Sequence, residues 1–485
     1  MGRVTDVLVV GAGPTGLTLA CDLARRGIAV RVIDKAPAFP HGSRGKGLSP
    51  RTLEVLDDLG VTDRIMAAGV THLPHRRYQG AEVIAEVDPE AGREPTDEIP
   101  YPAGLLIPQW RVEQILRDRL ADFGVTVELA TELTGLQQDA GGAEAAIGHD
   151  GDRIRAKYLA ACDGGRSTVR RRLGLELHGE TPDVQLMAVG DVEVDGLSRD
   201  AWHQWLTPAG GIMLCPLPGT RAFQVQAAHE LDAAGHPLEP TRERFQHTFD
   251  RVAGIPGVRL HNLTWSSTYR VQVRMVDRLR AGRVFLAGDA AHVHPIAGGL
   301  GMNTGIQDAY NLGWKLGTVL HGQAAEGLLE TYAEERLPIA GELLSITSEA
   351  LAAVLDAIRL RGGGLDAAAV RDLSQLALAY PWSRLSRQAT DRPALPRPGD
   401  RPDRPRAGDR APDGKAGDRR LFDLFRGPHF TLLGPPGVTI EPSDLVRAHT
   451  IDGADTLTLV RPDGYIGLIA DPADPGAVRR YLDDL

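Results

Sequence analysis

The chain has 485 residues, a formal net charge of −10, 42% hydrophobic residues and 24% charged residues. This length predicts two or three domains, and the acidic balance argues against nonspecific nucleic-acid binding, which needs a basic surface. Cys21, Cys162 and Cys215 are too widely spaced for a disulfide framework or a zinc site, so no metal is expected. No segment has the roughly 18 apolar residues that cross a bilayer, so we expect a cytoplasmic protein without membrane contact.

The N-terminal residues have the pattern of a β-α-β unit. Residues 4–10 are apolar and β-branched, as in a buried parallel strand, and residues 11–16 form a glycine-rich turn. Helical periodicity over residues 17–26 ends at Gly27, and a second apolar strand over residues 28–33 leads to an aspartate. This order predicts a parallel sheet with a right-handed crossover.

The turn carries Gly11, Gly13 and Gly16 in the spacing GxGxxG. We expect Gly11 to allow the tight turn, Gly13 to let a pyrophosphate approach the backbone, and Gly16 to bring the helix close to the sheet. Asp34 lies at the end of the second strand, where a carboxylate accepts hydrogen bonds from ribose hydroxyls. The combination favours a dinucleotide with an unphosphorylated ribose, FAD or NAD, over a purely structural glycine turn.

The rest of the sequence predicts a second sheet and a separate C-terminal part. Short alternating segments in residues 181–275 predict an antiparallel sheet, which the strand-like residues 72–108 extend. Helical periodicity dominates residues 305–359. Six prolines with mixed Arg and Asp make residues 391–420 a linker or an extended wrap, and residues 421–485 then form a small third domain.

Two downstream motifs favour FAD over NAD. Asp163-Gly164 follows one strand-like segment, and Gly288-Asp289 ends the buried strand of residues 284–287 before a second glycine-rich turn. A carboxylate at this place lies at the carboxyl edge of the sheet, where cofactors bind, and Asp289 can accept hydrogen bonds from ribityl hydroxyls. The glycine-rich turn and the helix after it offer backbone N–H groups to the isoalloxazine ring.

With these motifs in this order and spacing, the sequence resembles the group A flavoprotein monooxygenases. Within that family it is most similar to the aromatic polyketide hydroxylases and the rifampicin monooxygenases. The resemblance covers nearly the whole chain. It includes residues 43–54 (SRGKGLSPRTLE), Pro108-Gln109, Glu335-Arg336-Leu337-Pro338 and Arg461-Pro462-Asp463-Gly464.

The resemblance implies an α/β fold with a Rossmann-like FAD-binding domain, an inserted antiparallel-sheet substrate domain and a thioredoxin-like C-terminal domain. The C-terminal domain has no cysteine, so no redox role is expected for it. The expected boundaries are 1–180 and 276–390 for the FAD-binding domain, 72–108 and 181–275 for the substrate sheet, 391–420 for the linker and 421–485 for the thioredoxin-like domain.

Site residues carry over by the same resemblance. Arg44 is the expected catalytic residue, near the flavin and the nicotinamide route, and a surface arginine that covers the pyrophosphate is the alternative. Trp202, Met213, Phe223 and Pro295 are expected to line a substrate pocket, with plain core packing as the alternative. The expected cofactor-binding residues are Gly11, Gly13, Thr15, Gly16, Asp34, Lys35, Arg44, Gln109, Leu133, Thr168, Asp289, Gly301, Met302 and Asn303.

The implied function is a monooxygenase that uses NADPH or NADH and O2 to hydroxylate an aromatic polyketide-type substrate through a flavin C4a-hydroperoxide. No second Rossmann fingerprint occurs in the sequence, which fits a nicotinamide that binds transiently. Baeyer–Villiger oxygenation and antibiotic inactivation are the alternatives within this fold. A flavin-dependent halogenase is disfavoured because its WxWxIP signature is missing, and a non-catalytic FAD-binding protein is the alternative from another class.

The expected partners are a small polycyclic aromatic molecule and O2, with the protein as a monomer or a homodimer. His292 and His294 are close enough to the Gly-Asp motif to suggest acid–base roles. A structural histidine beside this turn is the favoured interpretation for both residues, because a phenolic substrate needs little help from a protein base.

Overall fold

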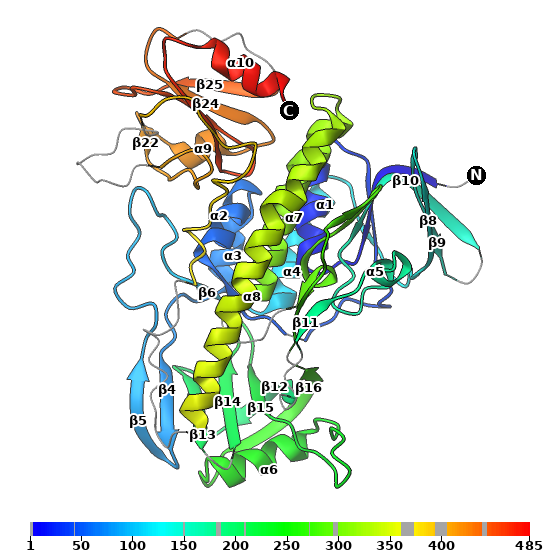
Figure 1. Ribbon diagram of the computed structural model, residues 1–485. Coiled ribbons are helices and arrows are strands. Elements are labelled where there is room, and N and C mark those ends of the chain that lie inside the picture. The colour runs from blue at the N-terminus through cyan, green and yellow to red at the C-terminus, as the bar shows by residue number, and fades with distance from the viewer. Residues whose placement is uncertain are drawn as a thin grey trace.

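A computed structural model describes residues 3–42, 44–148, 151–180, 186–207, 210–270, 272–293, 299–359, 373–392, 405–438 and 444–485. In these residues the chain forms three bodies along the long axis of the molecule (Figure 1). A central α/β body lies between a β-sheet body, which carries α6 (Arg242–Val252), and a small C-terminal body. The long helix α8 (Glu330–Arg359) runs from the central body to the sheet body. None of the helices in these ranges is both long and apolar enough to cross a membrane.

The central body is built on a mostly parallel sheet around β1 (Arg3–Val10). β1 pairs in parallel with β2 (Val30–Ile33) on one side and with β10 (Asp152–Ala161) on the other. The second half of β1, residues 7–10, is an uninterrupted apolar run because both faces of the sheet are covered there, and Val7 and Leu8 have no exposed surface. The order is β18-β19-β10-β1-β2-β7, and β9 and β8 extend the sheet from β10. The remaining strands are β7 (Val127–Glu128), β8 (Leu133–Asp139), β9 (Gly142–Ile147), β18 (Arg280–Ala281) and β19 (Val284–Leu286).

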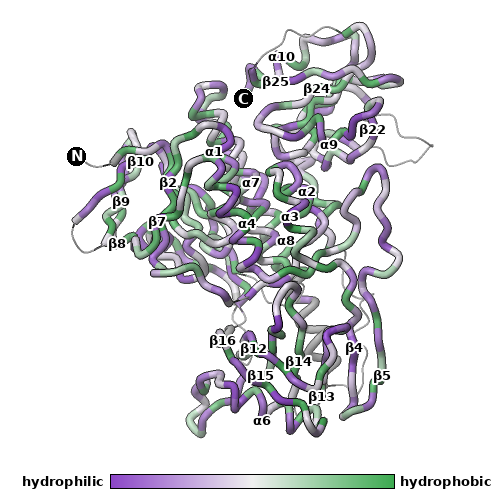
Figure 2. The backbone as a smooth tube through the Cα atoms, turned by 180° about the vertical axis from the view of Figure 1, so that it is seen from behind, coloured by the Kyte–Doolittle hydropathy of each residue, from purple (hydrophilic) through white to green (hydrophobic). Residues whose placement is uncertain are grey.

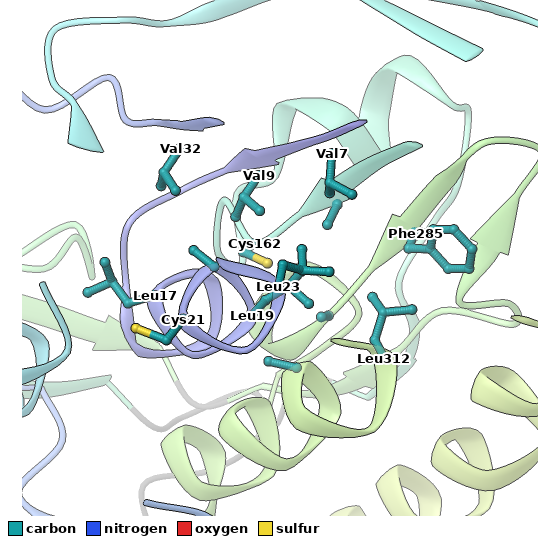
Figure 3. Packing of buried hydrophobic residues seen from close by; sticks show 14 of the residues in the cluster. Val7, Val9, Leu17, Leu19, Cys21, Leu23, Val32, Cys162, Phe285 and Leu312 are labelled. Atoms are coloured by element: carbon teal, nitrogen blue, oxygen red, sulfur yellow. The ribbon is translucent and has the colours of Figure 1, made fainter. Parts of the chain in front are cut away.

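Helices α1 (Pro14–Arg25) and α7 (Leu300–Leu320) pack against each other on one face of this sheet. Figure 3 shows Leu19 of α1 near Val9 of β1, and Leu312 of α7 beside Phe285 of β19. These side chains belong to one buried hydrophobic cluster. The other helical elements of the central body are α2 (Pro50–Asp58), α3 (Thr62–Ala68), α4 (Gln109–Asp122), α5 (Thr168–Arg172), η1 (Gly288–Ala290) and η2 (Glu326–Leu329).

The sheet body combines two segments that are far apart in the sequence. β4 (His75–Gln79) and β5 (Glu82–Val87) form one edge, and β4 pairs in parallel with β13 (Trp202–Thr207), beside which it lies in Figure 2. The order is β16-β12-β15-β14-β13-β4-β5, and the other neighbouring strands are antiparallel. The remaining strands are β12 (Leu186–Asp195), β14 (Gly210–Pro216), β15 (Ala222–Ala228) and β16 (Arg259–Arg270).

Two small sheets lie where the central body meets the sheet body. One pairs β3 (Gly47–Leu48) with β6 (Leu105–Leu106), and the other has the order β11-β17-β20. Both bring residues from before and after the inserted segments together, so they tie the insertions to the central body. The strands of the second small sheet are β11 (His178–Glu180), β17 (Val273–Met275) and β20 (His292–Val293).

The C-terminal body is a five-stranded sheet with the order β21-β27-β26-β24-β25. β24 (Phe430–Gly434) is parallel to β25 (Val446–Thr450) and antiparallel to β26 (Leu457–Val460), and β27 (Ile466–Ala470) is antiparallel to β26. The remaining elements are β21 (Arg387–Gln388), β22 (Lys415–Ala416), β23 (Arg419–Arg420), α9 (Leu421–Phe425) and α10 (Gly476–Asp483).

The described residues 405–420, which fall in the predicted linker, are packed against the rest of the protein. Ala411 and Asp413 are buried, and the Arg410 guanidinium lies 2.6 Å from a carboxylate oxygen of Glu54 in α2. These contacts hold this part of the chain against α2. Residues 393–404 lie outside the described residues.

A buried group of charges, here called the interdomain network, joins the C-terminal body to α7 and α8. Arg461 donates to both carboxylate oxygens of Glu335 in α8, at 2.6 and 3.0 Å, and its guanidinium also pairs with Asp463 at 2.5 Å. Lys315 of α7 donates to Glu335 at 2.7 Å, and the Trp314 indole donates to Asp463 at 3.0 Å. Burial raises the pKa of Glu335, but the charges of Arg461 and Lys315 outweigh this effect and keep the carboxylate ionised.

Candidate active site

The glycine turn between β1 and α1 is as tight as its spacing predicts. A Cβ on Gly11, whose φ is 104°, would lie 2.3 Å from the Cys162 carbonyl oxygen, and one on Gly16 would lie 2.0 Å from the Gly11 carbonyl oxygen. A Cβ on Gly13 would meet no atom within 4 Å, so this position faces open space. Gly13 is also the N-cap of α1, and no described side chain caps the helix. The first N–H groups of α1 are therefore directed at a place where an anion can bind.

Asp34 holds the glycine turn from the end of β2. Its Oδ2 accepts a hydrogen bond from Ala12 N at 2.8 Å, and its Oδ1 accepts one from Ala36 N at 2.8 Å. Each carboxylate oxygen has a second lone pair, so Asp34 keeps acceptor capacity for the hydroxyls of a ribose. The neighbouring Lys35 is exposed to solvent.

The Asp-Gly motif lies directly beside the glycine turn. Asp163 Oδ2 accepts hydrogen bonds from Thr168 N at 2.7 Å and Val169 N at 3.2 Å, which fixes the start of α5. Asp163 Oδ1 is buried and has no hydrogen-bond partner among the described residues. Because buried polar atoms are normally paired, this oxygen marks the neighbourhood of the glycine turn as a place for a polar ligand or water.

Thr15 connects the first motif to the Gly-Asp motif. Its hydroxyl oxygen would lie 2.5 Å from a Cβ on Gly288 and 2.4 Å from a Cβ on Gly305 of α7. The two glycines therefore leave the space in which Thr15 packs. Thr15, an expected cofactor-binding residue, is thus also the point at which α1, η1 and α7 meet.

Asp308 of α7 holds the Gly-Asp turn by hydrogen bonds, a role that the sequence motifs do not reveal. Its Oδ2 accepts from Gly288 N at 3.0 Å and pairs with His292 Nε2 at 2.6 Å, and its Oδ1 accepts from Arg336 Nε at 2.7 Å. Burial raises the pKa of Asp308, but the charges of His292 and Arg336 outweigh this effect and hold it far below its usual range. His292 is buried in this group, as its structural interpretation predicts, whereas His294 lies outside the described residues.

Asp289 itself points outward at the carboxyl edge of the sheet and is exposed. Surrounding protein atoms raise its pKa, while the charges of His292 and Arg44 oppose this shift. Arg44 is also exposed. The two side chains that the sequence assigns to cofactor binding and catalysis therefore face the same open region.

The N-terminus of α7 completes this region. Its N-cap is Gly299, whose φ is 64°, and no described side chain caps the helix. A Cβ on Gly301 would meet no atom within 4 Å. Asn303 is bound by the protein itself, since it accepts from Ser49 N at 2.8 Å and donates to the Gly47 carbonyl oxygen at 3.1 Å. Its amide side chain thus positions residues 47–49 against α7, beside the expected ring site.

Gln109 joins the segment around Gly45 to α4. It accepts from Gly45 N at 3.0 Å and donates to Glu113 at 2.8 Å, and Met302 Sδ would lie 3.5 Å from a Cβ on Gly45. The Leu133 side chain is buried in the hydrophobic core and is therefore not available to a ligand. Thr168 contributes its backbone N–H to Asp163.

Comparisons with known proteins identify this arrangement. A family model described as FAD binding domain matches residues 4–347. The chain belongs to this FAD-binding family. A flavin-dependent monooxygenase of Mycobacteroides abscessus is 42% identical over 484 residues, which covers 96% of this chain and 97% of the relative. A 6-methylpretetramide 4-monooxygenase of Streptomyces rimosus is 43% identical over 354 residues, which covers 72% of this chain and 62% of the relative. The solved structure of an anhydrotetracycline hydroxylase from Streptomyces rimosus has a TM-score of 0.77 at 28% identity and covers 99% of both chains.

The residues present fit FAD. The open Gly13 position and the uncapped start of α1 suit a diphosphate, and Asp34 at the end of β2 suits a ribose. The open Gly301 position and the uncapped start of α7 suit the flavin ring. Within the described ranges, no group of three His, Cys, Asp or Glu side chains is arranged to hold a metal ion.

Strand alternation decides which residues of the sheet body face the FAD-binding body. Side chains of a strand alternate between the two faces, and Phe223 and Val225 of β15 pack on the α6 face with Phe249. Gln224 and Gln226 lie on the opposite face, here called the cleft face, where Gln224 contacts the FAD-binding body. The predicted pocket position of Phe223 is therefore wrong, because the composition of a strand buried on both faces does not reveal which face meets the ligand.

The other predicted pocket residues have different outcomes. Trp202 and Met213 are half-buried, and strand register puts Met213 opposite Gln226 and Gln204, which places it on the cleft face. Trp202 lies on that face as well, since the Lys46 ammonium is 4.4 Å from its ring centroid. Pro295 lies outside the described residues. The cleft face also holds buried polar side chains that sequence reasoning missed, namely Asp191, Gln204, Gln224 and Gln226, and the buried Lys46 of the FAD-binding body reaches it.

The buried Glu113 makes the stability of the protein depend on pH. Burial raises the pKa of Glu113 from 4.5 to about 7, against the opposing effects of Gln109 and Arg117. A carboxyl group with a raised native pKa binds its proton more tightly in the folded state, so stability falls as pH rises from about 4.5 to about 7. We expect Glu113→Gln to raise the free energy of unfolding by about 1–3 kcal/mol at pH 8 and by much less at pH 5.

Urea unfolding of the protein at both pH values measures this effect. Asp118→Asn is the matched control, because Asp118 lies on the same helix but is half exposed and pairs with Arg64 at the surface. We expect the control to change stability by less than about 1 kcal/mol at either pH. Equal changes for Glu113→Gln at pH 5 and pH 8 would contradict the raised pKa.

Proposed function

We propose that this protein is an FAD-dependent monooxygenase that uses NADPH or NADH and O2 to hydroxylate an aromatic, polyketide-type substrate. The observation that carries the proposal is the convergence of the starts of α1 and α7, which no described side chain caps, at the carboxyl edge of one parallel sheet. Family membership supports the cofactor. Relatives named for methylpretetramide and anhydrotetracycline support the class of substrate.

Bound FAD supplies the redox and oxygen-transfer chemistry, and the chain supplies binding, orientation and electrostatics. The first N–H groups of α1 would bind the diphosphate, and Asp34 would accept from the ribose. The N-terminus of α7 would offer its N–H groups to the flavin ring and stabilise negative charge on it. Asp308 holds the Gly288 turn in place, and the cleft face of the sheet body orients the substrate and excludes water.

We also infer a division of labour among the three bodies. Residues 1–180 and 276–390 form a discontinuous FAD-binding domain, and the sheet of residues 72–108 and 181–275 forms the substrate domain. A thioredoxin-like origin of residues 421–485 is supported by the order of the C-terminal sheet, in which β24 is parallel to β25, β26 and β27 follow in antiparallel order, and α10 comes last.

The function is tested with the purified protein after reconstitution with FAD. We expect absorption bands near ~370 and ~450 nm, which belong to the flavin chromophore. A panel of polycyclic phenols and quinones is then screened for stimulation of NADPH oxidation, and the product is expected to carry one added oxygen with its rings intact. A protein that stays colourless, or an NADPH oxidation rate that no aromatic compound changes, would overturn the proposal. A product with an opened or expanded ring would replace hydroxylation by Baeyer–Villiger chemistry.

A single substitution checks the cofactor assignment of Asp289. We expect Asp289→Ala to weaken FAD binding about 10–100-fold, because a hydrogen bond to a charged group contributes about that much to affinity. Asp277→Ala is the matched control, since Asp277 is exposed and pairs only with the neighbouring Arg278 among the described residues. FAD content after gel filtration measures both. Equal FAD retention in the two variants would contradict the assigned role of Asp289.

A further inference from the structure

Lys46 is a buried lysine that the FAD-binding body presents to the sheet body. It lies in the segment that Gln109 and Asn303 hold beside the start of α7, because Gly45 N donates to Gln109 and Asn303 donates to the Gly47 carbonyl oxygen. Its side chain leaves this segment toward the cleft face, and only 9% of the residue is exposed. A cation therefore stands between the expected ring site and the substrate sheet.

Contacts on the cleft face hold the Lys46 ammonium in place. Its Nζ donates a hydrogen bond of 2.6 Å to Gln224 Oε1 and lies 4.4 Å from the centroid of the Trp202 ring. Gln226 donates to the same Gln224 oxygen at 2.9 Å. Asp191 lies opposite Gln224 in the strand register, so it belongs to the same face. Gln224, Gln226 and Asp191 are all buried, so together they form a buried polar cluster, here called the polar floor, on the cleft face.

The rim of this floor is aromatic and half-buried. Trp202 and His75 stack edge to face at 4.8 Å, and Met213 is also half-buried on the cleft face. A polycyclic ligand could lie against Trp202 and Met213 while its edge reaches Lys46. This arrangement of apolar walls and a few convergent polar groups is typical of small-molecule sites.

The polar floor has hydrogen-bond donors to spare. An ammonium group has three donors, and Lys46 makes one hydrogen bond to the residues that the structure describes. Trp202 Nε1 is buried, and it donates to none of the described residues. Burial lowers the pKa of Lys46, while the nearby Cys215 and Asp191 raise it. Burial, followed by the charge of Lys46, lowers the pKa of His75. An anionic oxygen placed here would offset the cost of burying the cation.

We propose that Lys46 binds an acidic phenol or enol oxygen of the polycyclic substrate as its oxyanion, with Trp202 against the ring. The oxygen–hydrogen bond of the phenol breaks, its proton passes to the solvent, and the electron pair stays on the oxygen that faces the ammonium. An oxyanion pushes electron density into its ring, which suits attack on an electrophilic oxygen. This inference rests on the proposed function, which it narrows to substrates that carry an ionisable oxygen.

The test uses two probes that differ in one group, 2-hydroxyanthraquinone and 2-methoxyanthraquinone, with the FAD-loaded protein at a pH below the pKa of the free phenol. The visible band of the hydroxy probe moves to longer wavelength when the oxygen ionises. We expect the unmodified protein to show the oxyanion band and to bind the hydroxy probe at least about tenfold more tightly than the methoxy probe, as expected for a charge-assisted hydrogen bond.

Lys46→Met removes the charge and keeps most of the side-chain length. We expect this variant to lose the oxyanion band and to bind both probes with similar affinity. If Lys46 had a purely structural role, the substitution would weaken the binding of both probes equally and leave the band of any bound ligand unchanged. Gln224→Glu is a second variant, which keeps the lysine but pairs it with an internal carboxylate, and we expect it to lose the band as well. Lys157→Met, at an exposed lysine that pairs with Asp6, is the control with unchanged probe binding.

The outcomes separate this inference from the proposed function. An oxyanion band that survives in both Lys46→Met and Gln224→Glu would overturn the inference, as would an unmodified protein that binds neither probe or binds both equally. The proposed function stands in those cases if other aromatic compounds stimulate NADPH oxidation. FAD content and melting temperature of each variant show that the fold and the cofactor are retained.

Discussion

Gly16→Ala is expected to cost the protein most of its FAD. A Cβ at this position would lie 2.0 Å from the Gly11 carbonyl oxygen and 3.2 Å from the Cys162 side chain. The first of these is backbone within the turn that cradles the diphosphate, so the turn has to shift. Overpacking of this kind costs about 1–3 kcal/mol, which corresponds to a loss of about 10–100-fold in FAD affinity.

Helix propensity alone predicts the opposite effect of Gly16→Ala on stability, which makes the experiment decisive. Alanine is better than glycine within a helix by about 1 kcal/mol, so without the close approach the variant would be more stable. Gly327→Ala is the control, since a Cβ there meets no atom within 4 Å and the residue lies far from the turn in the sequence. FAD content after gel filtration and the melting temperature are measured for both variants. A Gly16→Ala protein that retains FAD like the control would show that the turn tolerates a side chain.

Arg461→Met is expected to lower the free energy of unfolding by about 3–5 kcal/mol. The substitution removes one cation from a buried group of paired charges and leaves its carboxylate partners without it. The interdomain network balances Arg461 and Lys315 against Glu335 and Asp463, and the side chains of all four have at most 1% exposure. Without Arg461, two buried carboxylates face a single ammonium. Trp314, Tyr380 and Tyr465 surround the guanidinium within 6 Å of their centroids, so water does not readily replace it.

Urea unfolding measures this loss, and limited proteolysis shows whether the C-terminal body separates first. Arg480→Met is the matched control, because Arg480 belongs to the same body but is exposed and pairs with Asp474 at the surface. We expect the control to change stability by less than about 1 kcal/mol. Similar stability of the two variants would mean that the network contributes little to holding the bodies together.

Local spacing explains why the nucleotide-binding part was predictable. The strand, the glycine turn and the helix around Gly11 follow one another within one short segment, and Gly16 is required by the Gly11 carbonyl oxygen of the same turn. The same holds for Gly288-Asp289, which ends a strand. Membership in the FAD-binding family confirms the cofactor that these motifs predicted.

Non-local pairing explains what the sequence did not reveal. The parallel pair of β4 and β13 joins residues that are more than a hundred positions apart, and no local pattern specifies it. Phe223 was misplaced because neighbouring residues of a fully covered strand are all buried, whatever face they occupy. Asp308, Lys46 and Gln224 escaped notice for a related reason: a polar residue within an apolar segment shows its role only when its distant partner is known.

The order of strands in the central sheet has a consequence for synthesis of the chain. β10 stands between β1, from the first residues made, and β19, which is made only after the whole sheet body. The face of α1 is closed by α7, which ends at Leu320. The ribosome therefore has to synthesise about two thirds of the chain before β1 and α1 can contact all their final neighbours. Contacts of such long sequence separation also form slowly. Until then their apolar surfaces stay open to chaperones.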